Sequence, residues 1–361
     1  VLFVVIANFT GNVSTVYDAR KTVPYGQIQI DLTYSTRDTA YPENNLDFIL
    51  KQNPLDETLV DDIKRLDGVT DVQIRYMTYM KDQTGNLESV GVLNSKQFED
   101  EAYQGSLKGE VDYDQAARNG EIFYGWSYFL EDSGHKLGDQ VTVTLGNASG
   151  ETGFQGILAG AFGATNYDWI VTDKTYENLR LPGKSISTIW VDCDEKDCGI
   201  VRNGLEELLE NKQHYELSTY QGALKTSENS LGMFETLAYG LLFLVGLIVF
   251  MNMANTMIIS IITRKRELGV MQALGMTNRQ MNRMLRNEGM ILTIGSILVS
   301  LLVGMPAGYA LFCYGRAHSY FGLDIYHIPL AEILVMVMVL SVLQISLSYI
   351  LSRNVKKESV V

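Results

Sequence analysis

The stretch Arg264-Lys-Arg-Glu-Leu-Gly-Val-Met-Gln-Ala-Leu-Gly275 is a short charged segment between two long uncharged runs. No charged residue occurs from Thr236 to Thr263, from Gly289 to Gly315, or from Ile333 to Ser352. A helix of about 20 apolar residues crosses the hydrocarbon layer of a bilayer. The sequence therefore predicts three transmembrane helices, at about residues 236–262, 289–313 and 332–352.

The basic residues indicate how these helices are oriented. Between the second and third runs the only Lys or Arg is Arg316, whereas the first loop holds six basic residues against Glu267 and Glu288. Positive residues collect on the cytoplasmic side. We therefore expect the first loop inside the cell and, by alternation, residues from about 18 to 235 outside. The six basic residues are Arg264, Lys265, Arg266, Arg279, Arg283 and Arg286.

The charged segment itself has the pattern of a short helix. Leu268, Met271 and Leu274 recur at three-residue spacing, and Gly275 suits the left-handed residue that ends a helix. Thr277 and Gln280 then form a capping-box pattern that begins the next helix. Two alternatives follow: an ordinary positive-inside loop resting on lipid headgroups, or a coupling helix that docks into a partner protein.

Several motifs in this region resemble the carboxy-terminal membrane region of the FtsX and MacB permeases, the membrane subunits of the mechanotransmission class of bacterial ABC transporters. They are Asn252-Met-Ala-Asn-Thr256, Arg264-Lys-Arg-Glu-Leu-Gly269, Ala273-Leu-Gly275, Gln280 and Asn287-Glu-Gly289. In that family the Arg-x-Arg-Glu-x-Gly segment is the cytoplasmic helix that contacts the ATP-binding subunit. Gln272 departs from the pattern, because many relatives carry Arg there.

The resemblance implies a coupling site for an ATPase partner. Its residues would be Arg264, Lys265, Arg266, Glu267, Leu268, Gly269, Met271, Ala273, Leu274 and Gly275. In this interpretation the arginines and Glu267 supply charged contacts, and Leu268, Met271 and Leu274 supply apolar ones.

The resemblance also implies the function of the whole chain. It is similar to a non-catalytic permease subunit, paired with a second copy or half, in contact with membrane lipids in the bacterial cell membrane. The partner ATPase would bind ATP and Mg, and this chain would bind no cofactor. Movement of the extracellular domain would export or extract a peptide, antibiotic or lipid-linked substrate. Alternatively, as in the FtsX branch, the movement would activate a cell-wall hydrolase without transporting cargo.

The distribution of charge excludes nucleic acid as a partner. The 361 residues have a net charge of −13, and residues 264–361 carry ten basic against five acidic residues. The remaining 263 residues are therefore strongly acidic. An acidic soluble part joined to a basic membrane part repels a polyanion.

The expected fold is a multi-pass α-helical membrane protein with a large extracellular α+β domain similar to the MacB core. Val1 to Phe9 are apolar but too few to span, and we interpret residues 1–20 as the outer end of a truncated transmembrane helix with its stalk. Residues 21–225 would form the core domain, with an insert at about 80–165. Residues 226–361 would form the FtsX-like domain, whose first helix extends from about residue 220 to 262.

Periodicity within the core domain predicts two strand–helix–strand units. The first comprises a strand at 28–32, a helix starting at Asn53-Pro54 and ending before Gly68, and a strand at 69–79. The second comprises a strand at 187–191, a helix at 200–209 and a strand at 214–218. Together they could form a split βαβ sheet with helices on one face. Residues 141–145, 156–161 and 168–172 predict strands of a smaller β subdomain.

Polar and small residues within the membrane runs favour helix packing. Asn252 and Asn255 lie one turn apart, where an amide facing another helix can form a hydrogen bond. Ser296, Ser300, Gly304 and Gly308 recur every fourth residue and would allow close approach of a second helix.

The sequence contains no recognised catalytic motif and no histidine pair for a metal. The four histidines show no paired spacing, and no Gly-x-Ser-x-Gly motif is present. Cys193 and Cys198 flank Asp194 to Asp197 in the part expected outside the cell, where disulfides form. A disulfide, two free thiols, or a metal site with the neighbouring aspartates all stay open at this point.

Overall fold

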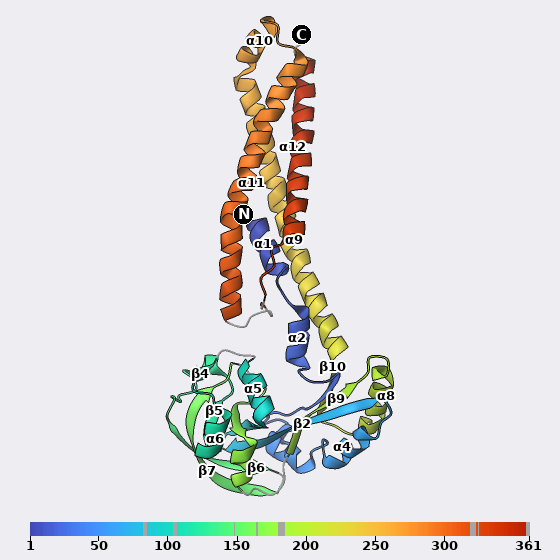
Figure 1. Ribbon diagram of the computed structural model, residues 1–361, viewed down its shortest axis with the longest axis vertical. Helices are drawn as coiled ribbons and strands as arrows, with labels where there is room; N and C mark the ends of the chain where they lie inside the picture. Colours follow the sequence, from blue (N-terminus) through green and yellow to red (C-terminus); the bar gives the residue numbers. More distant parts are fainter. Residues whose placement is uncertain are drawn as a thin grey trace. The chain divides into compact units, whose positions relative to one another are not determined.

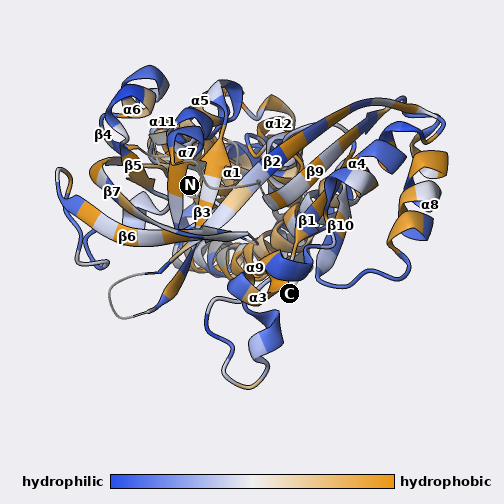
Figure 2. Ribbon diagram, turned by 90° about the horizontal axis from the view of Figure 1, so that it is seen from below, coloured by the Kyte–Doolittle hydropathy of each residue, from blue (hydrophilic) through white to orange (hydrophobic). Residues whose placement is uncertain are grey.

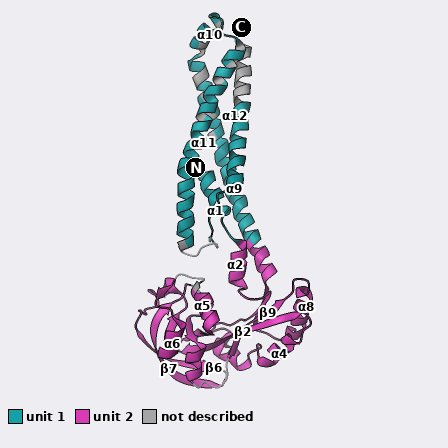
Figure 3. Cartoon of the chain, in the orientation of Figure 1, with its two compact units in different colours: residues 1–14, 228–316, 320–361 teal, residues 15–227, 317–319 magenta. Residues whose placement is uncertain are grey.

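A computed structural model describes residues 1–81, 85–103, 107–147, 149–163, 165–179, 185–317, 323 and 325–358. The chain divides into two units (Figure 3), each described here by itself. Unit 1 holds residues 1–14, 228–316 and 320–361, and unit 2 holds residues 15–227 and 317–319. The unit boundary at 227/228 lies two residues from the predicted end of the core domain, residue 225.

Unit 2 is built on one ten-stranded sheet with the order β10-β1-β9-β2-β3-β8-β5-β7-β4, and β6 pairs with β2 and β7. The alternation of apolar and polar residues along the strands can be followed in Figure 2. The strands are β1 (Ile28–Leu32), β2 (Val69–Lys81), β3 (Leu87–Leu93), β4 (Lys108–Gly109), β5 (Ile122–Tyr124), β6 (Gln140–Asn147), β7 (Gly150–Ala161), β8 (Trp169–Thr172), β9 (Ser185–Cys193) and β10 (Tyr215–Thr219).

The predicted split βαβ arrangement is confirmed. Helix α4 (Glu57–Lys64) connects β1 to β2, and helix α8 (Cys198–Leu209) connects β9 to β10. Strand β9 lies between β1 and β2, and β1 lies between β9 and β10, with all these neighbours antiparallel. This is the topology of two interleaved βαβ units. Both helices pack on one apolar cluster, in which Ile63 of α4 and Leu205 of α8 are fully buried.

The first of these helices begins later than the sequence indicated. The carboxylate of Asp56 caps α4 by accepting a hydrogen bond of 2.7 Å from the Leu59 amide. Asn53 instead forms a local turn with the Leu55 amide at 2.9 Å, and its side-chain amide donates to the Ile186 carbonyl at 2.8 Å. Asn53 therefore looks like a cap in the sequence because it satisfies backbone groups of a turn, as Asn commonly does.

The chain between β2 and β9 adds a second half to the same sheet. It contributes β3 to β8 and the helices α5 (Ser95–Tyr103), α6 (Tyr113–Asn119) and α7 (Asp173–Asn178). Two further apolar clusters form its interior, one around Trp169 and Tyr176 and the other around Phe98, Phe123 and Phe162. Strand β2 is long enough, at 13 residues, to belong to both halves. Shorter helices complete the unit: α2 (Thr15–Thr22), η1 (Pro42–Asn44), α3 (Leu46–Ile49), η2 (Leu50–Gln52) and η3 (Ser127–Phe129).

Unit 1 consists of helices (Figure 1). They are α1 (Leu2–Thr10), α9 (Tyr220–Thr263, which begins in unit 2), α10 (Lys265–Ala273), α11 (Asn278–Ala317) and α12 (Leu330–Glu358). The single long helix predicted from residue 220 onward is confirmed. Within the described residues, two segments are long and apolar enough to cross a membrane, 220–256 and 279–316. The apolar part of α12 is shorter, at 330–346, so the third span stays a prediction.

Candidate functional site

Helix α10 and its two boundaries form the candidate site. It ends where Gly275 adopts a φ of +103°, a conformation that glycine reaches without strain. The Leu274 amide donates to the Val270 carbonyl and the Met276 amide to the Met271 carbonyl, each at 3.0 Å. These bonds satisfy carbonyls that the last helical turn leaves unpaired. The left-handed stop predicted at Gly275 is therefore present.

The capping box predicted at the start of α11 is also present. The Thr277 hydroxyl oxygen accepts from the Gln280 amide at 3.3 Å, and the Gln280 side-chain oxygen accepts from the Thr277 amide at 2.9 Å. Two backbone donors at the helix start are thus satisfied reciprocally. Because a stop signal and a start signal lie two residues apart, α10 is a separate helix rather than a continuation of either neighbour.

An ion-pair group fixes the beginning of α10 to α11. Arg264 Nη1 lies 3.1 Å and 3.3 Å from the two carboxylate oxygens of Glu288, and Arg264 Nε lies 3.5 Å from Glu267. All three side chains are partly exposed, so the pairs contribute little stability, typically about 0–1 kcal/mol. Arg264, which the sequence assigned to a partner contact, is therefore already engaged within the chain, whereas Arg266 is exposed.

The remainder of α10 presents an exposed apolar surface. The exposed fractions are 83% for Leu274, 54% for Val270 and 38% for Met271. Gly269 and Ala273 are exposed too, while the side chains of Lys265, Leu268 and Gln272 lie outside the described part of the structure. A nine-residue helix that leaves large apolar side chains uncovered beside charged ones has the chemistry of a docking surface for a protein groove.

The predicted membrane packing residues differ in their surroundings. A Cβ atom added at Gly304 would lie 2.8 Å from Val4 Cβ, and one added at Gly308 would lie 2.7 Å from Asn8 Cβ, so these glycines bring α1 close to α11. Ser300 is half-buried, and Ser296 is exposed one turn earlier. The second group, Asn252 and Asn255, is exposed on α9, so the interhelical contact expected for these amides is not formed within the described chain.

One polar side chain of α1 and one just after it also bond to the segment before α12. The Asn8 side-chain oxygen accepts a hydrogen bond from the Tyr326 hydroxyl, and the Asn12 side-chain amide donates to the His327 carbonyl at 2.9 Å. Both asparagines are buried. Sequence reasoning missed this contact, although two asparagines one turn apart in an apolar stretch signal a polar partner in the same way as Asn252 and Asn255 do.

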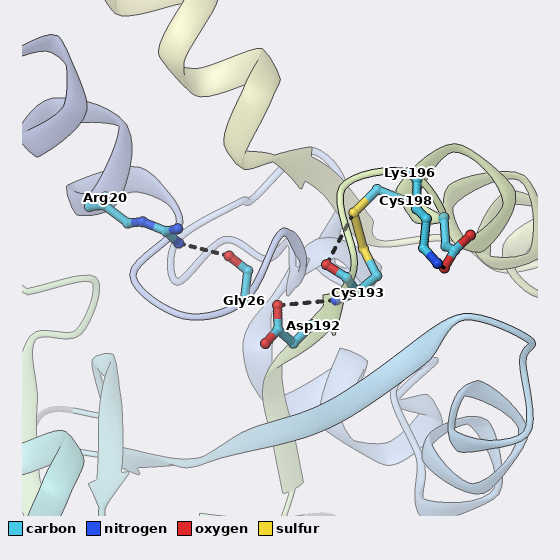
Figure 4. Close-up of a disulfide and its surroundings, with 7 residues drawn as sticks. Arg20, Gly26, Asp192, Cys193, Lys196 and Cys198 are labelled. Carbon is cyan, nitrogen blue, oxygen red and sulfur yellow. Dashed lines mark hydrogen bonds and ion pairs between the residues drawn. A yellow bond between two sulfur atoms is a disulfide. The ribbon is translucent and has the colours of Figure 1, made fainter.

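The structure joins Cys193 and Cys198 in a disulfide between the end of β9 and the start of α8 (Figure 4). The Cα atoms lie 5.5 Å apart, within the range that a disulfide spans. Since the bond occupies both sulfurs, they are not available as metal ligands. Within the described ranges, no group of three or more His, Cys, Asp or Glu side chains is placed to hold a metal ion.

A buried polar network in unit 2 is the main feature that sequence reasoning missed. Arg75 is 4% exposed, and its guanidinium pairs with Glu101 of α5 at 2.9 Å and lies 4.8 Å from the Trp190 ring centroid. Burial by itself lowers the pKa of Arg75, but the Glu101 carboxylate offsets this, so the pKa is raised. Arg75 Nε has no hydrogen-bond partner among the described residues.

Asp31 extends this network across β1. One carboxylate oxygen accepts from Thr188 at 2.8 Å, and the other accepts from the Gln29 amide at 2.5 Å. The Gln29 side-chain oxygen in turn accepts from Trp190 Nε1 at 2.5 Å. Burial disfavours the ionised form and raises the pKa of Asp31, although both hydrogen bonds oppose the shift.

Comparison with curated proteins finds no match. The solved structures that are similar to part of the chain include two at 13% sequence identity. The first is the periplasmic region of MacB from Actinobacillus actinomycetemcomitans, with a TM-score of 0.33, covering 60% of this chain and 99% of that one. The second is the extracellular domain of the noncanonic ABC-type transporter YknZ from Gram-positive bacteria, with a TM-score of 0.29, covering 53% of this chain and 100% of that one.

The family comparison concerns the part of the chain that contains α10. Residues 239–359 match the family model described as FtsX-like permease C-terminal. This range includes most of α9 and all of α10 and α11, and it agrees with the resemblance carried by the Arg264 motif. The carboxy-terminal part of this chain, residues 239–359, is therefore similar to the FtsX-like permease C-terminal domain.

Proposed function

We propose that this chain is the permease subunit of an ABC transporter and that α10 is its coupling helix. The observation that carries the proposal is the exposed apolar surface of Val270, Met271 and Leu274, held between two long apolar helices within the FtsX-like match. The ATP-binding subunit would bind this surface and also bind ATP and Mg. Arg266 and Glu267 would supply charged contacts at its edge.

The ion pairs at Arg264 give the coupling helix a mechanical role. Because only residues 274–277 separate α10 from α11, and Arg264 also contacts Glu288 of α11, a displacement of α10 would be passed to α11. Two copies in the bacterial cell membrane, each with its ATPase, would convert nucleotide-driven closure into movement of the long helices. The sheet unit would then act outside the membrane on a peptide, antibiotic or lipid-linked substrate.

The direct test is co-purification of the full-length permease with its ATPase subunit in detergent. Leu274→Asp and Glu267→Lys should abolish association, since the first places a charge in the apolar contact and the second reverses a charge at its edge. Leu107→Asp is the matched control, because this leucine is 41% exposed but belongs to unit 2. Equal binding of all three variants would refute the coupling-helix assignment.

A second measurement distinguishes transport of cargo from activation of a cell-wall hydrolase. If the complex transports cargo, its ATPase activity in nanodiscs should rise when the substrate is added. If the activity rises only on addition of a cell-wall hydrolase, the protein is a regulator and the transport assignment is wrong.

A further inference from the structure

The chain enters unit 2 through α2 and leaves it through α9, and these two segments are bonded to each other. Arg20 of α2 donates a hydrogen bond of 2.7 Å to the Gly26 carbonyl (Figure 4), and its guanidinium lies 3.9 Å from the ring centroid of Tyr220. The Tyr220 amide, at the start of α9, donates to the Gln27 carbonyl at 2.9 Å. The segment that leads from α2 into β1 is therefore bonded to the first turn of α9.

This entry segment is also pressed against the sheet. Gly26 has a φ of +59°, and a Cβ atom at this position would lie 2.6 Å from the Val191 carbonyl oxygen of β9. The Gln27 amide donates to the same carbonyl at 3.0 Å. A side chain at Gly26 would displace backbone of β9, so the entry segment lies directly on the sheet.

Tyr25 connects the entry segment to the second half of unit 2. Its ring lies edge-on to Trp190, with centroids 4.8 Å apart, and its hydroxyl donates to Asp100 of α5 at 2.5 Å. Lys96 of α5 places its ammonium 5.2 Å from the centroid of the same ring. Tyr25 is thus in contact with both β9 and α5.

Helix α5 has two faces of different chemistry. On one, Asp100 bonds Tyr25, Glu101 pairs with Arg75, and the Gln97 side chain donates to the Ile74 carbonyl at 3.0 Å. On the other, Phe98 is fully buried in the cluster with Phe123 and Phe162. Helix α5 contacts the split βαβ half through a few directional polar bonds, whereas it contacts the rest of the second half of unit 2 through apolar packing.

From this division we infer that α5 is the conformational link of unit 2 and that Tyr25 positions it. Directional bonds hold α5 in a fixed orientation to Tyr25, Ile74 and Arg75, and the packed aromatic cluster moves with α5 as one body. A shift of the entry and exit segments would therefore change the tilt of α5, and the second half of unit 2 would move with α5. The inference rests on the proposed function only for the source of that shift.

The first test uses the full-length protein without its ATPase, by hydrogen–deuterium exchange. Tyr25→Phe removes the bond to Asp100 and keeps the ring, so exchange in residues 95–103 should rise about tenfold, as expected for loss of one hydrogen bond to a charged group. Tyr113→Phe is the matched control, because Tyr113 donates to Asp173 at 2.5 Å within the second half of unit 2, and a phenylalanine ring can keep its contact with Phe98. It should leave residues 95–103 unchanged.

Arg20→Gln tests transmission, because Arg20 contacts Gly26, Val23 and Tyr220, which all lie outside α5. This variant should raise exchange in α5 while α4 and α8 keep their rates. Unchanged exchange in α5 in both Tyr25→Phe and Arg20→Gln, or an equal rise in α4 and α8, would overturn the inference.

The second test adds the ATPase. Spin labels at Asn203→Cys of α8 and Gln155→Cys of β7, in a Cys313→Ser background, report the distance between the two halves. The nucleotide-dependent change in distance should occur in the parent and the Tyr113→Phe protein and be lost in Tyr25→Phe. The ATPase should bind the parent protein and both variants. If it does not bind the parent protein, the proposed function is refuted, and the exchange test alone decides the inference. A full distance change in Tyr25→Phe would overturn the inference.

Discussion

Arg75 and Arg264 both pair with glutamates, but the pair in unit 2 is buried and the pairs in unit 1 are exposed to water. In unit 2 the Arg75–Glu101 pair is almost completely removed from water and lies against the Trp190 ring. In unit 1 the Arg264 pairs with Glu267 and Glu288 stay about half exposed. A buried pair is costly to break because one charge is left without a partner, whereas an exposed pair is replaced by water.

Apolar residues show the same difference. Ile63 and Leu205 of unit 2 are fully buried, whereas Leu237 and Leu302 of unit 1 are more than 70% exposed. Unit 2 therefore buries these apolar side chains within the chain. The apolar surface of unit 1 is not covered by the described part of the chain. On α9 and α11 this surface suits contact with lipid and with a second copy. Four predictions test this comparison.

The largest effect is expected from Glu101→Ala. It leaves the Arg75 guanidinium buried and unpaired, which should destabilise unit 2 by roughly 3–5 kcal/mol. Glu288→Ala is the matched change in unit 1, and it should cost less than about 1 kcal/mol because its partner is exposed. Native-state hydrogen exchange in the full-length protein gives both free energies of opening. Equal losses would remove the distinction between the two units.

Core truncation comes next. Ile63→Ala empties space in the α4–α8 cluster, and we expect a loss of about 3 kcal/mol in the opening free energy of β1 and β9. Leu274→Ala, at an exposed position of α10, should change the stability by no more than about 0.5 kcal/mol while weakening ATPase association. A stability loss at Leu274 comparable to that at Ile63 would show that α10 is packed rather than available.

Within unit 1, the contact of α1 with α11 is the exception that resembles a protein core. Gly308→Ala would place a methyl group against Asn8 and should destabilise the α1 contact by roughly 1–3 kcal/mol. Gly295→Ala has nothing within 4 Å of the new Cβ and should stabilise α11 by roughly 0.5–1 kcal/mol. Exchange rates of the α1 amides separate the two outcomes, and faster exchange in both variants would contradict the assigned contact.

The smallest effect is a pH dependence in unit 2. Since the folded pKa of Asp31 is raised by burial, its stabilising contribution is complete below the unfolded pKa and is lost as the pH rises through the folded value. The stability of Asp31→Asn relative to the parent should therefore increase as the pH rises from about 4 to 7. We would measure it by exchange of the β1 amides, corrected for the intrinsic rate at each pH.

Asp38 provides the control of opposite sign. Hydrogen bonds from the Tyr41 amide and the Asn44 side chain lower its pKa, so its contribution is present above the unfolded pKa and is lost as the pH falls through the folded value. The relative stability of Asp38→Asn should decrease as the pH rises toward about 4, the range below the unfolded pKa, and then stay constant from about 4 to 7. The same trend for both variants would mean that the local surroundings do not set these pKa values.

Much of the fold could be predicted because its signals are local. Ile28 to Leu32 alternate, the runs around residues 236–263 and 289–315 lack charge, and Gly275 and Thr277 carry stop and start chemistry. The structure has a strand, two long helices and a helix break at these places. The coupling residues are a different case, since motif resemblance located them but only a binding measurement can assign their partner.

The sequence by itself determined that one part of the chain is acidic and forms its own core and that the other has long apolar helices. Burial preference and charge are properties of each residue and its immediate neighbours. Tertiary structure decided which distant residues meet. Arg75 and Glu101, Tyr25 and Asp100, and Asn12 and His327 are brought together only by strand order and helix packing. No periodicity encodes such pairs, because their distance depends on the closure of long loops and on the packing of every element between them.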